Sequence, residues 1–220
     1  MAWDAQRYDA WFDSAWGGYA FAVELRTVQE TARVRLGEKV LEVGAGTGRF
    51  GAALADSGAT VYGLDMDADM LSLARGRLEG RGVLADAHNL PFRANTFDLA
   101  LAVTVCEFTE DVPQVIAELA RVTRGGGRLV VGSLNPRSAW GIMSRGRRRA
   151  EPWRSARFLS RRQLLALGRR HGQNSLRGAL FSVEGLGAGK LAVLLEQAGR
   201  LAPALGALQV LRVEIPDPAS

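Results

Sequence analysis

The stretch Lys-Val-Leu-Glu-Val-Gly-Ala-Gly-Thr-Gly, residues 39–48, decides the fold of this chain. The apolar residues Val40, Leu41 and Val43 are typical of a short buried strand in a parallel sheet. The glycines that follow predict a sharp turn into a helix that starts near Arg49, since glycine adopts positive φ and lets a ligand approach the backbone. Free N–H groups at the helix N-terminus would complete a nucleotide-type pocket at the carboxyl end of the sheet.

The spacing of the glycines allows two interpretations. Gly46, Gly48 and Gly51 fit the dinucleotide fingerprint G-x-G-x-x-G, but the glycine that directly follows the strand is Gly44, so this register is wrong. The observed pattern starts with Glu42, an acid at the strand end, and such a carboxylate suits a cationic ligand better than a pyrophosphate. The pattern resembles the first motif of the class I S-adenosylmethionine (SAM) methyltransferases. A nicotinamide oxidoreductase, or a glycine-rich turn without a ligand, is the weaker alternative.

The composition is that of one sizeable α/β domain. The chain has 220 residues, of which 47% are hydrophobic, and it contains no run of 18 apolar residues that could span a membrane. The first residues do not resemble a signal peptide. A single cysteine, Cys106, excludes an intrachain disulfide, and with only two histidines no zinc-type cluster can be assembled. These features predict a cytoplasmic protein without a metal.

Charge is unevenly distributed along the chain. The net charge is +5, but residues 137–172 contain eleven arginines and one acid, Glu151. This segment is a candidate track for phosphates or anionic head groups. Because nearly all basic residues of the chain are arginine, part of this signal reflects composition.

Residues 3–36 are expected to be helical and are rich in aromatic side chains. Tyr8, Trp11 and Phe12 have helical spacing and would share one face. The pair Gly17-Gly18 predicts a break before a second helix at about residues 20–35. The segment packs on the sheet edge or acts as a lid over the pocket. As a lid it would give the pocket an aromatic wall and a tyrosine hydroxyl, and Tyr19 is the candidate for that hydroxyl on the cofactor side.

An acid ends the second predicted strand, residues 59–64. Asp65 lies 17 residues after Gly48, close to the spacing that places a carboxylate at the ribose hydroxyls. Met66 would lie on the adenine face, and Asp67 is expected to cap a helix over residues 68–78.

The segment after the third predicted strand, residues 83–85, resembles a further element of the same family, an acid and a small residue before Leu-Pro-Phe at residues 90–92. The resemblance implies that Asp86 accepts a hydrogen bond from the adenine amino group and that the backbone N–H of Ala87 reaches the ring. His88 stands where many relatives carry an acid, and we interpret it as a surface variant rather than a base.

The fourth strand is predicted at residues 96–103, and the residues after it should face the methionine end of SAM and the acceptor. Thr104 belongs to this segment, and Glu107 is the candidate substrate-orienting carboxylate, with helix capping as an equal alternative. The Asn/Asp-Pro-Pro-aromatic run of the amino-methyltransferases of nucleic acids and protein glutamine is absent. Cys106 is expected to be a buried, inert thiol.

A helix at residues 111–123, Arg124-Gly125-Gly126-Gly127 and a strand at residues 128–132 extend the resemblance over residues 39–133. We expect an α/β fold with one Rossmann-like, doubly wound, mostly parallel sheet, a C-terminal antiparallel strand and helices on both faces. Its parts are an N-terminal lid (1–36), a SAM-binding core (37–133), a basic substrate-side insert with a helix at residues 160–170 (134–178), and a C-terminal strand pair (179–220). In the last part we expect strands at residues 179–183 and 208–215 around a helix at residues 190–201.

The resemblance implies methyl transfer from SAM to a small molecule by in-line alignment, for which no catalytic base is required unless the acceptor must lose a proton. Glu42 would orient the methionine portion of SAM, and the backbone of Gly44, Ala45, Gly46 and Gly48 would approach it. The residues expected to enclose the acceptor are Tyr8, Trp11, Phe12, Glu107, Asn135 and Trp140. The open alternatives are an RNA, lipid or quinone acceptor that uses residues 137–172, or a non-catalytic SAM-binding protein.

Overall fold

The computed structural model describes residues 4–144, 154–186 and 189–217. Residues 145–153 of the basic segment and Trp3 of the predicted N-terminal helix lie outside the described residues. Within the described ranges, no helix is both long and apolar enough to cross a bilayer.

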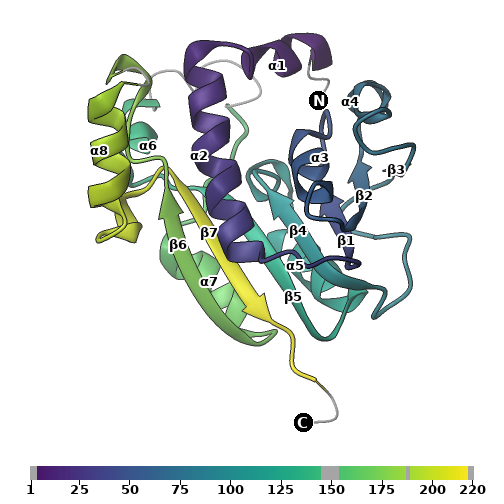
Figure 1. Cartoon of the computed structure of the whole chain (residues 1–220). Helices are drawn as coiled ribbons and strands as arrows, with labels where there is room; N and C mark the ends of the chain where they lie inside the picture. Colours follow the sequence, from purple (N-terminus) through teal and green to yellow (C-terminus); the bar gives the residue numbers. More distant parts are fainter. Residues whose placement is uncertain (1–3, 145–153, 187–188, 218–220) are drawn as a thin grey trace.

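The described strands form one sheet in the order β3-β2-β1-β4-β5-β7-β6 (Figure 1). Strand β7 is antiparallel to both of its neighbours, while the pairings from β3 to β5 are parallel. This topology confirms the predicted Rossmann-like sheet with its C-terminal antiparallel strand. The strands are β1 (Lys39–Val43), β2 (Thr60–Asp65), β3 (Gly82–Leu84), β4 (Phe97–Val103), β5 (Thr123–Leu134), β6 (Gln173–Ala179) and β7 (Leu208–Glu214).

Helices cover both faces of the sheet, as expected. The described α-helices are α1 (Ala5–Trp11), α2 (Ala15–Ala32), α3 (Arg49–Ala55), α4 (Ala68–Ala74), α5 (Val112–Val122), α6 (Ala139–Met143), α7 (Arg161–Arg169) and α8 (Lys190–Gly199). Short 3₁₀ turns lie at η1 (Cys106–Phe108), η3 (Glu184–Leu186) and η4 (Pro203–Leu205). In Figure 1, α2 and α3 lie in front of the sheet, and α5 and α7 lie behind it.

The core follows this division into two layers. Behind the sheet, Ile116 and Leu119 of α5 and Leu164 of α7 are fully buried in one apolar cluster. In front of it, Val28 of α2 and Leu54 of α3 are fully buried in a second cluster. The central strands contribute to both clusters because successive side chains of a strand point to opposite faces.

The end of α2 is fixed to the sheet by two arginines. Arg128 of β5 donates hydrogen bonds to the carbonyls of Ala32 and Arg33 and forms an ion pair with Glu38 at 2.6 Å, and both side chains of the pair are nearly fully buried. Arg212 of β7 donates to the carbonyl of Thr31 at 2.6 Å. Positive charge at a helix C-terminus stabilises the helix, so these contacts anchor α2 across the antiparallel part of the sheet.

Two predicted boundaries are wrong. Gly17 and Gly18 do not break a helix but lie in the first turn of α2, and a Cβ on Gly17 would lie 2.0 Å from the carbonyl oxygen of Trp11. Glycine is therefore needed there for the close approach of α1 and α2. The sixth strand is Gln173–Ala179 instead of residues 179–183. It is an edge strand with alternating exposure, so its pairing with β7, rather than an apolar run, defines it.

Candidate functional site

The carboxyl ends of β1, β2 and β4 meet at one edge of the sheet, and the glycine loop lies between them. Gly44, Gly46 and Gly48 all have positive φ, of 70°, 52° and 79°. A Cβ on Gly44 would lie 2.1 Å from Cγ2 of Val105, and one on Gly46 would lie 3.6 Å from the ring of Tyr8. The side chains of Val105 and Tyr8 thus pack closely against the bare backbone of the loop.

Glu42 lies beneath this loop at the end of β1. It is only 2% exposed, and a Cβ on Gly51 of α3 would lie 2.6 Å from its Oε2. Oε2 has no hydrogen-bond partner among the described residues. Burial raises the pKa of Glu42 to about 8. A buried carboxyl with an unsatisfied oxygen is costly unless a donor or cation reaches it, so this site suits a positively charged ligand.

Asp65, at the end of β2, is hydrogen-bonded to the glycine loop. Its Oδ2 accepts from the N–H of Gly46 at 2.7 Å, and its Oδ1 accepts from the N–H of Asp67 at 3.0 Å. Burial is the main cause that raises its pKa. Met66 is 75% exposed beside it, and the side chain of Asp67 caps α4 as predicted.

Asp86 and Ala87 follow β3, with Asp86 exposed and Ala87 half-buried. Oδ1 of Asp86 accepts from the backbone N–H of His88 at 2.9 Å and contacts its Nδ1 at 2.7 Å. These hydrogen bonds lower the pKa of Asp86. The His88 ring therefore orients the Asp86 carboxylate, a contact that sequence reasoning did not anticipate.

The chain leaves β4 through a strained residue. Thr104 has a φ of 55°, a conformation that β-branched residues rarely adopt, and its N–H donates to the carbonyl of Gly132. Cys106 is fully buried, and burial raises the pKa of its thiol, so it is the inert cysteine that the sequence predicts. Backbone strain of this kind is common beside ligand sites.

Glu107 is fully buried at the start of η1. One oxygen, Oε1, accepts from the hydroxyl of Ser133 at 2.9 Å and from the N–H of Leu134 at the end of β5. The other oxygen, Oε2, has no partner among the described residues. Burial raises the pKa of Glu107 to about 7. One oxygen of this carboxyl is thus held by the end of β5, and the other is buried without a partner among the described residues.

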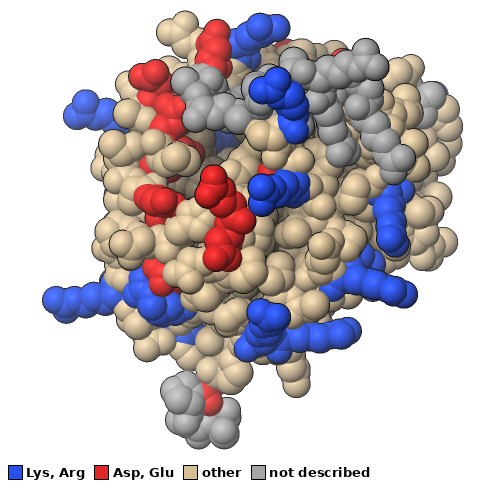
Figure 2. Space-filling model, turned by 180° about the vertical axis from the view of Figure 1, so that it is seen from behind, with Lys and Arg blue, Asp and Glu red and all other residues tan. Residues whose placement is uncertain are grey.

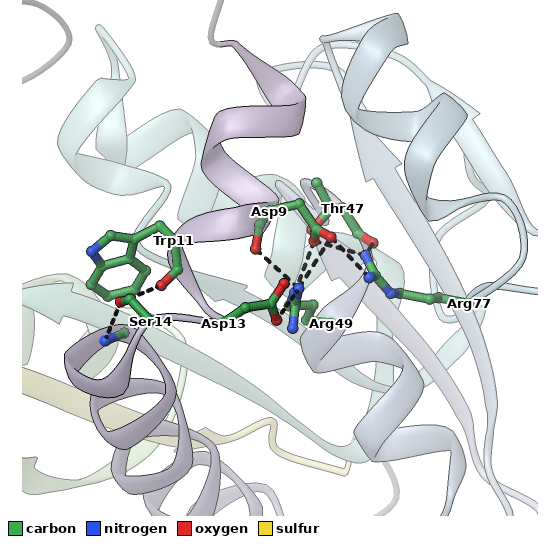
Figure 3. A network of polar contacts seen from close by, with 8 residues as sticks. Asp9, Trp11, Asp13, Ser14, Thr47, Arg49 and Arg77 are labelled. Atoms are coloured by element: carbon green, nitrogen blue, oxygen red, sulfur yellow. Dashed lines mark hydrogen bonds and ion pairs between the residues drawn. The ribbon is translucent and has the colours of Figure 1, made fainter.

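A network of ion pairs joins α1 to the glycine loop, as Figure 3 shows. The carboxylate of Asp9 lies 2.8 Å from Nε of Arg49 at the start of α3 and 2.8 Å from Nη1 of Arg77. It also accepts from the hydroxyl of Thr47, within the loop, at 2.6 Å. Hydrogen bonds from these two arginines hold the pKa of Asp9 well below its usual range. Sequence reasoning did not single out Asp9, since its partners are distant in the sequence.

The aromatic side chains predicted to form one wall of the pocket lie in different surroundings. Tyr8 lies over Gly46, and burial followed by the charge of Glu24 raises the pKa of its phenol. Phe12 is instead nearly buried in packing against Phe21 and beneath the Arg49 guanidinium, so it joins α1 to the body rather than facing an acceptor. Trp11 is 43% exposed and contacts the Phe12 ring.

Tyr19 and Asn135 each have distinct surroundings in the structure. Tyr19 packs on Trp16 in an apolar cluster that also includes Trp140, and burial followed by the charge of Glu196 of α8 raises its pKa. Its hydroxyl is buried and has no hydrogen-bond partner among the described residues. The side chain of Asn135 is engaged in its own loop: its amide donates to the carbonyls of residues 204 and 206, and its oxygen accepts from residue 137. Of the two acceptor contacts predicted in the insert, Asn135 and Trp140, only Trp140 lies against α2.

Comparison with known proteins agrees with this geometry. A family model described as a methyltransferase domain matches residues 41–131. An uncharacterised protein of Methanocaldococcus jannaschii is 30% identical over 167 residues, which is 74% of this chain and 75% of that protein. The chain belongs to the SAM-dependent methyltransferases. SAM is therefore its cofactor, as the sequence predicts.

Two further relatives extend the comparison. The methyltransferase GfsG of Streptomyces halstedii is 38% identical over 145 residues, which cover 61% of this chain but only 52% of GfsG. A crystal structure from Thermotoga maritima, described as a SAM-dependent methyltransferase and possible histamine N-methyltransferase, superposes with a TM-score of 0.75 at 25% identity. That match covers 96% of this chain and 95% of the other.

Proposed function

We propose that this methyltransferase transfers the methyl group of SAM to a small-molecule acceptor in the cytoplasm. The observation that carries the proposal is the contact between Asp65 and the N–H of Gly46, which joins an acid suited to ribose hydroxyls to a loop of bare backbone. The unsatisfied buried oxygen of Glu42 supports the same interpretation, because the methionine end of SAM carries positive charge.

In this proposal each part of SAM has its own contacts. Glu42 orients the methionine portion, and Gly44, Ala45, Gly46 and Gly48 let it lie against the backbone. Asp65 accepts from the ribose hydroxyls, in charge-assisted hydrogen bonds worth about 1.5–3 kcal/mol each. Met66 covers one face of the adenine, Asp86 and Ala87 hold its edge, and Thr104 borders the methionine end. Tyr19, whose buried hydroxyl has no partner among the described residues, stays a candidate contact on the cofactor side.

The chemistry asks little of the side chains beyond alignment. SAM supplies a methyl group already activated by the attached sulfonium sulfur. The protein must hold the acceptor nucleophile in line with the methyl–sulfur bond and exclude water. Helix α1, fixed over the loop by Asp9, and the ring of Tyr8 exclude water from the loop side. Glu107 and Trp140 remain the candidates that border the acceptor.

The charge at this edge of the sheet favours a small molecule over RNA. Exposed acids follow the strand ends, with Asp86 after β3 and Glu110 and Asp111 after β4. Figure 2 shows acidic side chains gathered at the upper left of the back face, with Lys and Arg mainly below and to their right. Acids beside the site would repel a phosphate backbone.

The test is a transfer assay with tritium-labelled SAM and a cell extract divided into small-molecule, lipid and nucleic-acid fractions. We expect label to enter the small-molecule fraction and to remain there after nuclease treatment. Label confined to RNA or to the lipid fraction would replace the proposed acceptor class. Absence of transfer into every fraction, with SAM bound, would favour a non-catalytic SAM-binding protein.

A further inference from the structure

Glu24 is an acid on the buried side of α2. It lies one helical turn after Ala20 and one turn before Val28, which are 1% and 0% exposed. Residues four apart share a helix face, so Glu24 stands on the stripe that faces the sheet. It is itself half-buried, and it has no hydrogen bond or ion pair with any described residue. An acid in such a position is unusual without a partner.

The carboxyl of Glu107 lies within electrostatic reach of Glu24. Burial, and next the charge of Glu107, raise the pKa of Glu24 to about 8. Because Ser133 and Leu134 fix Oε1 of Glu107, its buried Oε2 is the oxygen left for a ligand. The two acids come from different elements, α2 and η1. Val23 and Val28, on either side of Glu24 in α2, pack in one apolar cluster with Val103 and Leu134 at the ends of β4 and β5, where Glu107 accepts from the N–H of Leu134.

Glu107 lies three residues after Thr104, which borders the methionine end in the function proposed above. The phenol of Tyr8, whose ring lies over Gly46, senses the charges of Glu24, Glu42 and Asp65 together. Glu42 and Asp65 belong to the cofactor contacts proposed above. Glu24 and Glu107 are thus left for the acceptor.

Simple electrostatics indicates what would occupy this place. Two carboxyls without a cation cannot both ionise at low cost, whereas an ammonium group supplies the missing charge and three N–H donors. On the same helix, Tyr19 and Val23 pack together with Trp140 against the apolar cluster that includes Ala20 and Leu180. An amine on an apolar body would match both surfaces.

We propose that Glu24 and Glu107 form a subsite for the amino group of the methyl acceptor, so that this enzyme is an amine N-methyltransferase. This inference rests on the proposed function. The acceptor arrives as an ammonium ion and gives one proton to a carboxylate of the pair. The nitrogen lone pair then forms a bond to the methyl carbon, the methyl–sulfur bond breaks, and its electron pair stays on sulfur. The methylated nitrogen is again positive and is held by the remaining carboxylate until release.

The test uses three probes of similar shape: phenethylamine, 2-phenylethanol and 3-phenylpropionate. Each is titrated calorimetrically into protein saturated with S-adenosylhomocysteine (SAH). We expect phenethylamine to bind about tenfold or more tightly than the alcohol, and the carboxylate not to bind, since a charged hydrogen bond distinguishes them. Glu24→Gln should weaken the amine by about tenfold and leave SAH affinity within about twofold. The matched control Glu30→Gln, on the outer part of α2 and paired with Arg26, should change neither.

Three results would each overturn the inference: equal binding of the amine and the alcohol, no binding of any probe, or an unchanged amine affinity in Glu24→Gln. If SAH still binds, these results leave the proposed function intact. Failure of the wild-type protein to bind SAH would overturn the proposed function itself, and this inference with it. Glu107→Gln provides a second variant, in which Ser133 and Leu134 keep their acceptor.

Discussion

The carboxylate of Asp65 accepts a hydrogen bond from the backbone N–H of Gly46 at 2.7 Å. This contact couples the end of β2 to the glycine loop after β1. The loop that it holds contains three glycines with positive φ. The acid proposed to bind ribose therefore also shapes the surface on which the rest of the cofactor would lie.

The ion pairs of Asp9 should support cofactor binding. Asp9→Asn removes the charge that holds Arg49 and Arg77 against α1, so we expect SAH affinity to fall by about tenfold. The matched variant Asp13→Asn removes one more exposed contact to Arg49, at 3.1 Å, and should have little effect. Calorimetry on both variants measures this difference, and equal affinities would show that the network does not act on the loop.

A comparison of Gly44 with Gly80 separates two costs of adding a side chain at a glycine with positive φ, namely backbone strain and the clash with a neighbouring side chain. Gly44 and Gly80 have similar φ, of 70° and 76°, but a Cβ on Gly80 would meet nothing within 4 Å. Gly80→Ala should cost about 1–2 kcal/mol of unfolding free energy from φ alone. Gly44→Ala should cost about 1–3 kcal/mol more, because Val105 must move. Urea unfolding measures both values. Val105→Ala should recover part of the excess, and equal costs at the two glycines would contradict the close packing of Val105 on Gly44.

Stability should fall as pH rises through the neutral range. Burial raises the pKa of Glu24 and Glu42 to about 8 and that of Glu107 to about 7. Glutamate in an unfolded chain titrates near about 4.3, so between these values the folded protein binds more protons than the unfolded one. Their contribution is complete below about pH 4 and is lost as pH approaches about 8. His171, whose pKa is lowered by burial, opposes them near its own titration.

Thermal unfolding in buffers from about pH 5 to about pH 8.5 measures this slope. Glu24→Gln and Glu42→Gln should each flatten it, while the control Glu30→Gln, whose carboxylate pairs with Arg26, should not. A melting temperature that rises across the window in the wild-type protein would show that these carboxyls are ionised without penalty.

The buried ion pair of Arg128 and Glu38 should matter far more than an exposed one. Glu38→Gln leaves a charged guanidinium 5% exposed and only partly paired, and we expect a loss of about 3–5 kcal/mol. Glu79→Gln breaks a pair with Arg81 whose acid is 72% exposed, and should cost less than about 1 kcal/mol. Chemical unfolding compares the two, and similar losses would contradict the anchoring of α2 by Arg128.

The sequence predicts the central sheet well because its signals are local. Apolar runs, the glycines after residue 43 and the acid Asp65 each indicate a strand, a turn or a strand end within a few residues. The same reasoning failed at Gly17-Gly18, where glycine serves a contact with Trp11 rather than a break. It also failed at β6, whose half-exposed edge position gives no apolar run.

The less local parts of the site could not be found in this way. Asp9 contributes to the site through its ion pair with Arg77, which is 68 residues away along the chain. Glu24 has the helical spacing of a buried stripe, a signal visible in the sequence once Ala20 and Val28 are taken as its neighbours. Asn135 has the right place in the chain for an acceptor contact, but its amide is used by the loop around residues 204–206.

The most direct test of the cofactor assignment is calorimetric titration of SAH into the wild-type protein, Asp65→Ala and the control Asp69→Ala, with NADH as a second ligand. We predict micromolar binding of SAH, no binding of NADH, a loss of about tenfold or more in Asp65→Ala, and no change in Asp69→Ala. Preference for NADH, or SAH affinity that survives Asp65→Ala unchanged, would contradict the assignment of the glycine loop and Asp65 to the cofactor.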